Sequence, residues 1–224
     1  MRRAPAVTAT VSSVALVAWN NAVQPALRLS SRGRATAGTL LAVGVTGVGL
    51  ASGLRREELG LANFRAGLVW GSAAAAVPVV GYAVASATPS LHRRFSVPDE
   101  VRHDFAEWVA AHIPFGTVVT EELLFRGSLT ALTDRAFAPA SARSVRAAAF
   151  GLWHVHPAHV ANDSVPGTVA FTAAASLVFD WLRARSGSVL APALLHLAVN
   201  VGGALLLRRI QVATGADEVP LPPV

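Results

Sequence analysis

The chain has 224 residues, of which 53% are hydrophobic and 14% are charged, and its formal net charge is +6. Soluble domains carry about 25% charged residues, so this chain has too little polar surface to fold as a water-soluble domain. The absence of cysteine excludes disulfide frameworks, thiolate metal sites and cysteine nucleophiles.

The basic residues are all arginine, and they lie in small groups between apolar runs. They form no stripe with interleaved aromatic residues, which argues against nucleic-acid binding. Such groups are typical of the loops that flank membrane helices. We therefore expect a multi-pass protein of the cell (plasma) membrane, with the lipid bilayer as a partner. A slight excess of arginine in alternate loops favours a cytoplasmic N-terminus, and the arginine and alanine bias indicates a bacterial source.

Seven segments reach or approach the roughly 20 apolar residues that cross the hydrocarbon core of a bilayer. We predict an all-α, polytopic transmembrane helix bundle of about seven spans (range six to eight), folded as a single integral membrane domain over residues 1–224. The first segment follows Arg2 and Arg3 without a clear cleavage site, so we expect it to persist as a helix. The segments are Val7–Leu27, Thr36–Leu54, Ala66–Thr88, Pro114–Thr133, Ser144–Ala161, Val165–Leu182 and Ser188–Leu207.

An amphipathic helix is predicted before the fourth span, over Asp99–Ile113, with Pro98 and Asp99 as a plausible start. Its apolar positions recur at helical spacing, with charged residues opposite. Such a helix either lies at the membrane interface or packs on protein as a short connection. The recurring positions are Val101, Phe105, Trp108, Val109 and His112.

The fourth span contains two adjacent carboxylates, Glu121 and Glu122, and the cation Arg126. A charge at the centre of a membrane helix costs about 3 kcal/mol on insertion scales, so such residues usually face a polar interior. Glu122 and Arg126 are four residues apart with the acid first, the favourable order for an ion pair on one helix face. Glu121 lies about 100° round the helix from Glu122. One acid can therefore pair with Arg126 while the other faces a cavity, and the spacing leaves open which one does.

Imidazole and amide groups lie at membrane depth in two later spans. His154 is in the fifth, and His196 and Asn200, four residues apart and on one helix face, are in the seventh. Polar groups in lipid need partners, so the simplest packing gathers these groups and the two carboxylates into one internal polar cavity.

Other polar residues of these spans are expected to lie outside that cavity. Pro157 should end or kink the fifth helix, which would leave His156 and His159 near the interface. Asp180 and Arg183, three residues apart near the end of the sixth span, are interpreted as an interfacial ion pair.

A carboxylate and two imidazoles in a dry cavity are suited to activating water. Glutamate can accept a proton from the water, one histidine can share that proton or bind a metal, and a second histidine with an asparagine amide can donate to a developing oxyanion. The chain has neither a G-x-S-x-G elbow nor an H-E-x-x-H pair, so the serine-hydrolase and zincin arrangements are poorly supported.

Three motifs resemble those of the CAAX-processing and bacteriocin-processing (CPBP) intramembrane proteases, which include the type II CAAX prenyl endopeptidases. EELLFRG, from Glu121, matches the E-E-x-x-x-R motif, FGLWH (Phe150–His154) matches F-x-x-x-H, and LLHLAVN, which contains His196 and Asn200, matches H-x-x-x-N. They occur in the family's order on separate hydrophobic segments. The matching region, about residues 114–207, would be the catalytic core, and RREELGL (residues 55–61) resembles a loop that these proteins carry upstream.

This resemblance implies a division of roles among the polar residues. Glu121 would be the catalytic carboxylate that activates water with His154, and Glu122 would be a supporting acid held by Arg126. His196 and Asn200 would complete the site as metal ligands or oxyanion donors, and Phe150 and Arg126 would support it. If a metal is bound, Glu121, His154 and His196 are its expected ligands and Zn²⁺ is the expected ion.

The function implied is an intramembrane endopeptidase that hydrolyses a peptide bond near the membrane surface, with a peptide or membrane protein as its substrate. A prenylated CAAX-type tail is the substrate only where the source cell makes such tails. Two alternatives stay open: a non-proteolytic scaffold or bacteriocin-immunity protein of the same fold, and a transporter whose buried Glu and His relay protons.

Overall fold

The computed structural model describes residues 3–95 and 102–213. Within these ranges the secondary structure is helical, apart from turns and one isolated bridge between Leu61 and Ser188, which confirms the predicted all-α bundle. The elements are α1 (Arg3–Ala18), η1 (Trp19–Val23), α2 (Gln24–Ala26), α3 (Ser31–Ala51), α4 (Phe64–Ala87), α5 (Pro89–His92), α6 (Phe105–Glu107), η2 (Trp108–Val119), η3 (Glu122–Leu129), α7 (Thr130–Ala136), α8 (Pro139–Trp153), α9 (Val155–Val160), α10 (Val165–Ser186) and α11 (Leu190–Ala213).

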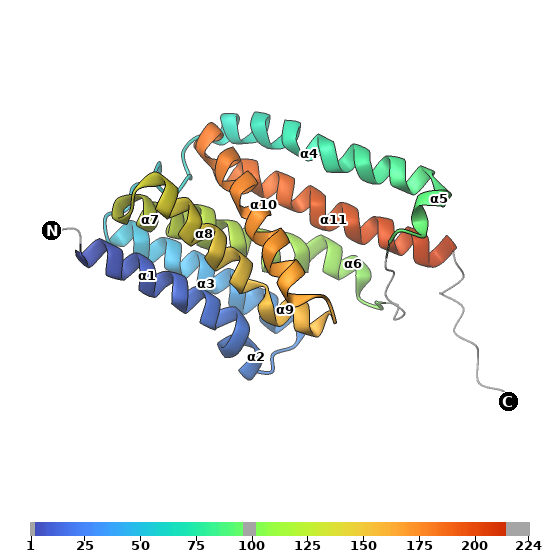
Figure 1. Cartoon of the computed structure of the whole chain (residues 1–224), viewed down its shortest axis with the longest axis horizontal. Helices are drawn as coiled ribbons and strands as arrows, with labels where there is room; N and C mark the ends of the chain where they lie inside the picture. The colour runs from blue at the N-terminus through green and yellow to red at the C-terminus, as the bar shows by residue number, and fades with distance from the viewer. Residues whose placement is uncertain (1–2, 96–101, 214–224) are drawn as a thin grey trace.

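Two series of these elements form continuous helices (Figure 1). The first comprises α1, η1 and α2. The second comprises α6, η2, η3 and α7, covers residues 105–136 and is called the central helix below. Segments η1, η2 and η3 are π-helical, a conformation that frequently marks functional sites when it interrupts an α-helix.

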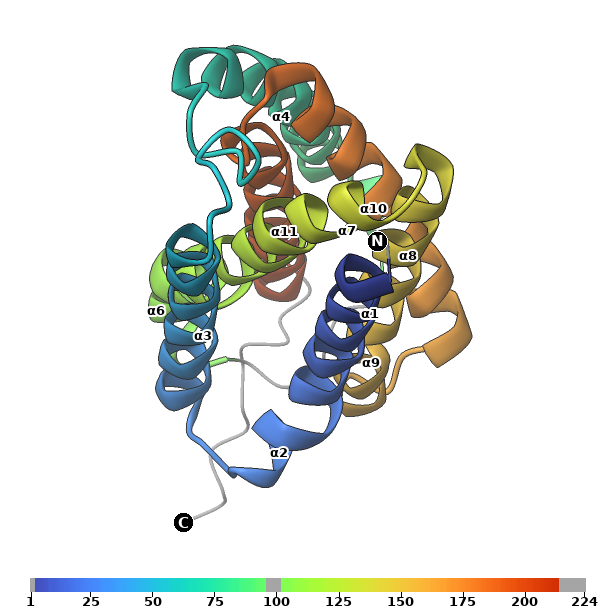
Figure 2. The same ribbon diagram turned by 90° about the vertical axis from the view of Figure 1, so that its left-hand side faces the viewer.

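The central helix has neighbours on several sides. It contacts α1, α3, α8, α10 and α11. Figure 2 shows it between α1 and α3 on one side and α4 and α10 on the other. Residues 124–131 are consequently buried throughout. The segment with the two adjacent carboxylates is therefore enclosed by other helices, whereas a lipid-facing helix would have an exposed side.

Among the described residues, five helices are long and apolar enough to cross a membrane, fewer than the seven segments expected. Their apolar side chains are widely exposed, as in Val77 of α4 (74%) and Phe171 of α10 (70%), which suits a lipid environment. The two other expected spans are helical, but the fourth carries three ionisable residues and the fifth is interrupted at His154. The five candidates are Ala4–Ala26, Ser31–Ala51, Phe64–Ala87, Val165–Ser186 and Leu190–Ala213.

The predicted amphipathic segment is the start of the central helix. Its expected first residues, Pro98 and Asp99, lie outside the described residues, and the helix described begins at Phe105. Phe105, Trp108 and Val109 pack into a cluster with Ala204 of α11 and with later residues of the central helix. These contacts agree with a short connecting helix packed on protein, the second of the two interpretations of this segment.

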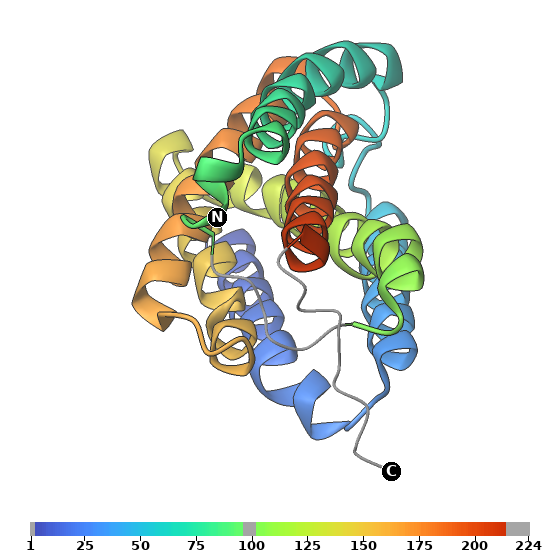
Figure 3. The ribbon, with the colours of Figure 1, turned by 90° about the vertical axis from the view of Figure 1, so that its right-hand side faces the viewer.

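Small residues allow close helix contacts at two places in the bundle. At Gly71 of α4, a Cβ atom would lie 2.9 Å from the Cα of Ala191 of α11, and these two helices run side by side (Figures 1 and 3). At Gly116 of the central helix, a Cβ would lie 2.7 Å from the Cβ of Ala35 of α3. Small residues are favoured where membrane helices approach closely, because their backbones can then pack directly.

Candidate active site

Glu121 lies in the central helix with its two carboxylate oxygens in different surroundings. Oε1 accepts a hydrogen bond of 3.1 Å from Nε1 of Trp153. Oε2 is buried and has no hydrogen-bond partner among the described residues. It lies 3.9 Å from Nε2 of His154 and 3.9 Å from Nε2 of His196. The carboxylate is thus anchored through one oxygen and presents the other to two imidazoles.

Hydrogen bonds at the far side of each ring fix which imidazole nitrogen faces Glu121. Nδ1 of His154 lies 2.7 Å from the carbonyl oxygen of Phe150, and a carbonyl only accepts, so Nδ1 carries the proton. Nδ1 of His196 lies 2.9 Å from Oε1 of Glu122, and it donates when that carboxylate is ionised. In the neutral rings, each Nε2 therefore presents a lone pair towards Glu121.

Glu122 and Arg126 form the expected ion pair, in fully buried surroundings. Nε of Arg126 lies 3.7 Å from Oε2 of Glu122 and 3.7 Å from Oδ1 of Asp180. The guanidinium carbon lies 4.2 Å from the ring centroid of Phe150 and 4.9 Å from that of Phe179. Arg126 is thus held between two carboxylates and two aromatic faces, which favour a cation that has lost its water.

Asp180 does not form the interfacial pair predicted with Arg183. It is 6% exposed, and its Oδ2 accepts a hydrogen bond of 2.6 Å from Nε of Arg146 on α8. Arg183 instead donates to the backbone carbonyls of Arg126 and of Glu57 and Glu58 in the loop after α3. The three-residue spacing was compatible with a pair, but both side chains have partners that are distant in the sequence.

The helix break at His154 confirms the interruption expected from Pro157, and two asparagines of η1 stabilise it. Pro157 has no N–H for the carbonyl of Trp153, which accepts instead from Nδ2 of Asn20 at 2.8 Å. Asn21 intervenes in the next helical hydrogen bond: its Nδ2 donates to the Leu152 carbonyl, and its Oδ1 accepts from the backbone N–H of His156. The first helix therefore holds Trp153 and His154 in position next to Glu121.

Asn200 lies one turn after His196 on α11, as the spacing predicted. Its Nδ2 donates to the carbonyl of His196 at 3.0 Å. An amide nitrogen carries two hydrogens, so one remains for another acceptor. Asn200 also lines both of the cavities that reach the site.

An apolar groove of about 890 Å³ reaches the site between α10 and α11. A smaller and more polar chamber, of about 380 Å³, reaches it between η1, α3 and the central helix. His154 and Asn200 line both, and Glu121 lines the chamber. The groove also includes Phe171, Val178, Phe179, Leu195 and His196, and the chamber includes Asn20, Arg34, His112, Thr120 and Trp153.

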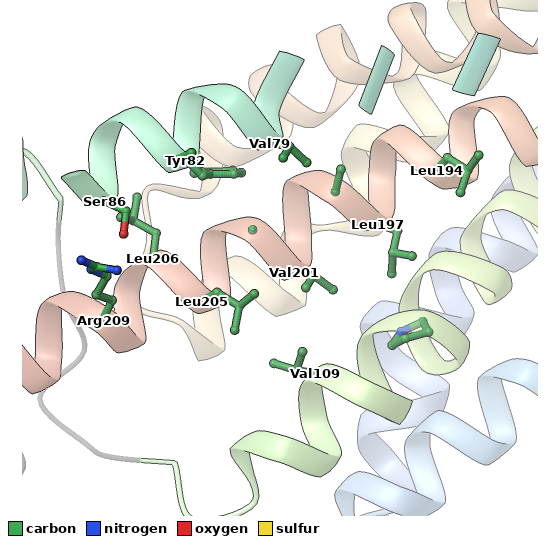
Figure 4. A pocket seen from close by; sticks show the side chains of 14 residues that line it. Val79, Tyr82, Ser86, Val109, Leu194, Leu197, Val201, Leu205, Leu206 and Arg209 are labelled. Atoms are coloured by element: carbon green, nitrogen blue, oxygen red, sulfur yellow. The ribbon is translucent and has the colours of Figure 1, made fainter. Parts of the chain in front are cut away.

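A second apolar groove, of about 730 Å³, lies between α4, α11 and η2 (Figure 4). Val79 and Tyr82 line it from α4, and Leu197 and Val201 line it from α11. Arg209 lies at one end of it in Figure 4. None of the polar residues expected at the site lines this groove, so it is a separate feature of the bundle.

The possible ligand atoms around Glu121 match a zinc site in chemical type, but their separations are larger than those of a zinc site. Two imidazole nitrogens and a carboxylate oxygen are a known zinc ligand set, and ligands of a tetrahedral Zn²⁺ are about 3.4 Å apart. Here the oxygen lies 3.9 Å from each nitrogen. Within residues 3–95 and 102–213, no group of three or more His, Asp or Glu is arranged to hold a metal ion. Zinc binding would require the side chains to approach by about 0.5 Å.

The structure brings together every residue that the sequence proposed for the site. Glu121, Glu122 and Arg126 come from the central helix, Phe150 and His154 from α8 and its end, and His196 and Asn200 from α11. Sequence reasoning missed other contributors, because no local spacing links them to the motifs. These are Asn20, Asn21, Arg146, Trp153, Phe179 and the inward orientation of Asp180.

One of the comparisons with known proteins gives a match that covers the site. The family model of type II CAAX prenyl endopeptidase Rce1-like proteins matches residues 105–202. No curated protein and no solved structure matches the chain. The matched region begins with the central helix and includes Glu121, His154, His196 and Asn200. With its multiple apolar helices the protein is a multi-pass membrane protein, and the region that carries its site matches the family of type II CAAX prenyl endopeptidase Rce1-like proteins.

Proposed function

We propose that the protein is an intramembrane endopeptidase in which Glu121 and His154 activate water for attack on a peptide bond. The observation that carries this proposal is the position of Glu121 Oε2, which is buried, lacks a hydrogen-bond partner and lies 3.9 Å from two imidazole nitrogens. A water molecule between atoms at that separation can hydrogen-bond to both.

Glu121 acts as the general base in this mechanism. Its Oε2 accepts one proton from the water while the water oxygen bonds to the carbonyl carbon of the substrate. His154 Nε2 orients the same water through its lone pair. The tetrahedral intermediate then expels the amine, which takes the proton back from Glu121. The products are a new carboxyl terminus and a free amine, and the base is regenerated.

His196 and Asn200 act on the oxygen that becomes negative. The free amide hydrogen of Asn200 can donate to that oxyanion. His196 donates there from Nε2 when it is protonated, and Glu122, 2.9 Å from its Nδ1, stabilises that charge. Arg126 lies 3.7 Å from Glu122 and pairs with it, and it is in this sense a supporting residue.

Glu121, His154 and His196 would hold a Zn²⁺ ion if the site binds one. When bound, such an ion supplies Lewis-acid polarisation and lowers the pKa of coordinated water. The anchoring of Glu121 by Trp153 and the orientation of the two rings serve the site with or without the ion.

The two cavities support an amphiphilic substrate. The apolar groove between α10 and α11 can accept a lipid-modified or otherwise apolar segment, and the polar chamber can accept the hydrophilic part of a peptide. Because His154 and Asn200 line both, a peptide that extends from one cavity to the other would pass the reactive groups. A prenylated CAAX-type peptide has this division.

The test is cleavage of a quenched fluorogenic CAAX-type peptide, with and without a farnesyl group, by the purified protein in liposomes. We expect the wild type to cleave the farnesylated peptide, and Glu121→Gln and His154→Gln to lose about 10²- to 10⁴-fold in rate, the usual contribution of general base catalysis. Activity measured before and after chelation, together with the metal content, tests the Zn²⁺ proposal.

Glu57→Gln is the matched control, because it removes an exposed carboxylate of the loop after α3 without touching the site. It should cleave at the wild-type rate. Equal cleavage by the wild type and both site variants would overturn the residue assignment. Tight peptide binding without turnover would favour the scaffold alternative.

A further inference from the structure

We propose that Asp180 and Arg146 are positioning residues, which hold Arg126 and, through it, Glu122 and His196 in the geometry of the site. The proposal rests on the proposed function for its kinetic consequence. The proposed effect on the orientation of the His196 ring does not depend on that function.

Five charged side chains alternate in sign from the site to the surface. Glu122 is followed by Arg126, 3.7 Å away, and Arg126 by Asp180, again at 3.7 Å. Asp180 accepts from Arg146 at 2.6 Å, and Arg146 donates from Nη1 to Asp134 at 2.7 Å. We call this series the charge ladder. Its members come from the central helix, α8 and α10, three elements that also position the site.

Because the inner members of the charge ladder are buried, the charge of each one must be compensated by its neighbours in the ladder. The side chains of Glu122, Arg126, Asp180 and Arg146 are at most 7% exposed, whereas that of Asp134 is 58% exposed. Removing one partner of a buried pair leaves an uncompensated charge, which is strongly unfavourable. The remaining members will therefore move to compensate, and the direction of that movement follows from the distances.

Arg126 is the member that can move. Its Nε lies equally far, at 3.7 Å, from Glu122 and from Asp180, and both Nε and Nη1 lack a hydrogen-bond partner. The charge of Asp180 thus balances that of Glu122 across one guanidinium. Without Asp180, Arg126 has Glu122 as its remaining close carboxylate and should approach to full hydrogen-bond distance. Glu122 would then be drawn away from Nδ1 of His196, with which it now makes a contact of 2.9 Å.

Arg146 fixes the other side of Asp180. It donates to Oδ2 of Asp180, to Oγ1 of Thr133 and to Asp134, so its guanidinium is held by α10 and by the central helix. Oδ1 of Asp180 is left for Arg126 and has no hydrogen-bond partner of its own among the described residues. Loss of Arg146 would free Asp180 to rotate towards Arg126 and would draw Arg126 away from Glu122.

Arg183 provides a matched control on the same helix as Asp180. It is 8% exposed, similar to Arg146 at 6%, but its hydrogen bonds go to the backbone carbonyls of Arg126, Glu57 and Glu58. Arg183→Gln therefore disturbs the packing of a buried arginine without removing a member of the charge ladder.

The first measurement is the ¹⁵N spectrum of histidine-labelled, chelator-treated protein at neutral pH, with His196→Gln to assign the His196 signals. In the wild type we expect a protonated Nδ1 and an unprotonated Nε2. In Asp180→Asn we expect the His196 signals to shift towards a mixture of the two tautomers, whereas Asp180→Glu should resemble the wild type and Arg183→Gln should not alter them.

The second measurement is cleavage of the farnesylated reporter peptide. Asp180→Asn and Arg146→Gln should each lower kcat about 10- to 100-fold with KM unchanged, because a misplaced catalytic group loses rate without losing substrate binding. Asp180→Glu should recover part of the rate. The double variant Asp180→Asn/Arg146→Gln should lose less than the product of the two single losses, because it removes a charge pair.

An Asp180→Asn protein with unchanged His196 signals would overturn the proposal, whatever its activity. A similar shift in Arg183→Gln would also overturn it, because general loosening of the bundle would then explain the change. A wild type that cleaves no peptide would contradict the proposed function, and the ¹⁵N spectra would still decide the role of Asp180 and Arg146.

Discussion

The protein contains two centres in which arginine compensates the charge of a carboxylate, and their hydrogen-bond geometries differ. In the loop after α3, Glu58 receives two hydrogen bonds from Arg135, at 2.7 and 2.8 Å, and two from Arg55, through its backbone N–H and its Nε. In the site, Arg126 stays 3.7 Å from both of its carboxylates. The exposed centre has reached ideal hydrogen-bond geometry, whereas the buried centre has unused donors and acceptors.

Packing explains the difference. The side chain of Arg135 is 42% exposed and can rotate freely to meet Glu58. Arg126 is fully buried, and the rings of Phe150 and Phe179 lie against it at 4.2 and 4.9 Å. Aromatic faces stabilise the cation, and the two carboxylates on either side of it attract it in opposite directions. A catalytic centre benefits from this arrangement, because groups that are not saturated by one another remain available to water and substrate.

The largest effect that would test this comparison is the loss of the buried arginine. Arg126→Met leaves buried Glu122 without its cation and removes one of the two arginines beside Asp180, and we expect a loss of about 3–5 kcal/mol in stability. Arg135→Met, the same change at the exposed centre, should cost at most about 1 kcal/mol. Thermal unfolding in one detergent measures both. Equal losses would contradict the distinction between the two centres.

An intermediate effect is expected from removing the anchor of Glu121. Trp153→Phe deletes the Nε1–H that donates to Oε1, while it retains an aromatic ring next to Phe125. An unsatisfied buried carboxylate oxygen costs about 1–3 kcal/mol, so cleavage of the reporter peptide should fall about 10- to 100-fold. Trp181→Phe, on the exposed face of α10, is the control and should retain the wild-type rate. An unchanged rate in Trp153→Phe would show that the anchor is dispensable.

The smallest expected effect is the pH dependence of the stability that Glu58 contributes at the exposed centre. The hydrogen bond from Arg135, together with the N–H of Arg55, lowers the pKa of Glu58 to about 2, from 4.5. Because the folded-state pKa is the lower one, the stability contributed by Glu58 is complete above pH 4.5 and is lost as the pH falls towards 2. The difference in melting temperature between wild type and Glu58→Gln should therefore shrink between pH 6 and pH 2.5. A difference that is independent of pH would contradict this ion pair.

Short-range patterns predicted part of the site correctly. The four-residue spacing of Glu122 and Arg126 favoured their pairing, although spacing alone left open which acid pairs with Arg126. Pro157 predicted the break beside His154, because it depends on the geometry of a single helix. The gathering of Glu121, His154 and His196 was predicted from the cost of isolated polar groups in lipid. Their catalytic roles remain predictions.

Contacts between residues far apart in the sequence could not be predicted from such short-range patterns. Asp180 was assigned to Arg183 on spacing alone, whereas the fold gives Asp180 to Arg146, 34 residues earlier, and Arg183 to loop carbonyls. The span count was also approximate, because hydropathy does not distinguish a lipid-facing helix from the central helix, which is enclosed by other helices.

The sequence by itself determined the helical membrane fold, the candidate site residues and the family that residues 105–202 resemble, because apolar length, helical spacing and motif order are local properties. The tertiary structure alone decided which oxygen of Glu121 is anchored, which imidazole nitrogens face it and which charges balance Arg126. Those choices depend on side chains from helices far apart in the chain, whose distances are set only when the bundle packs.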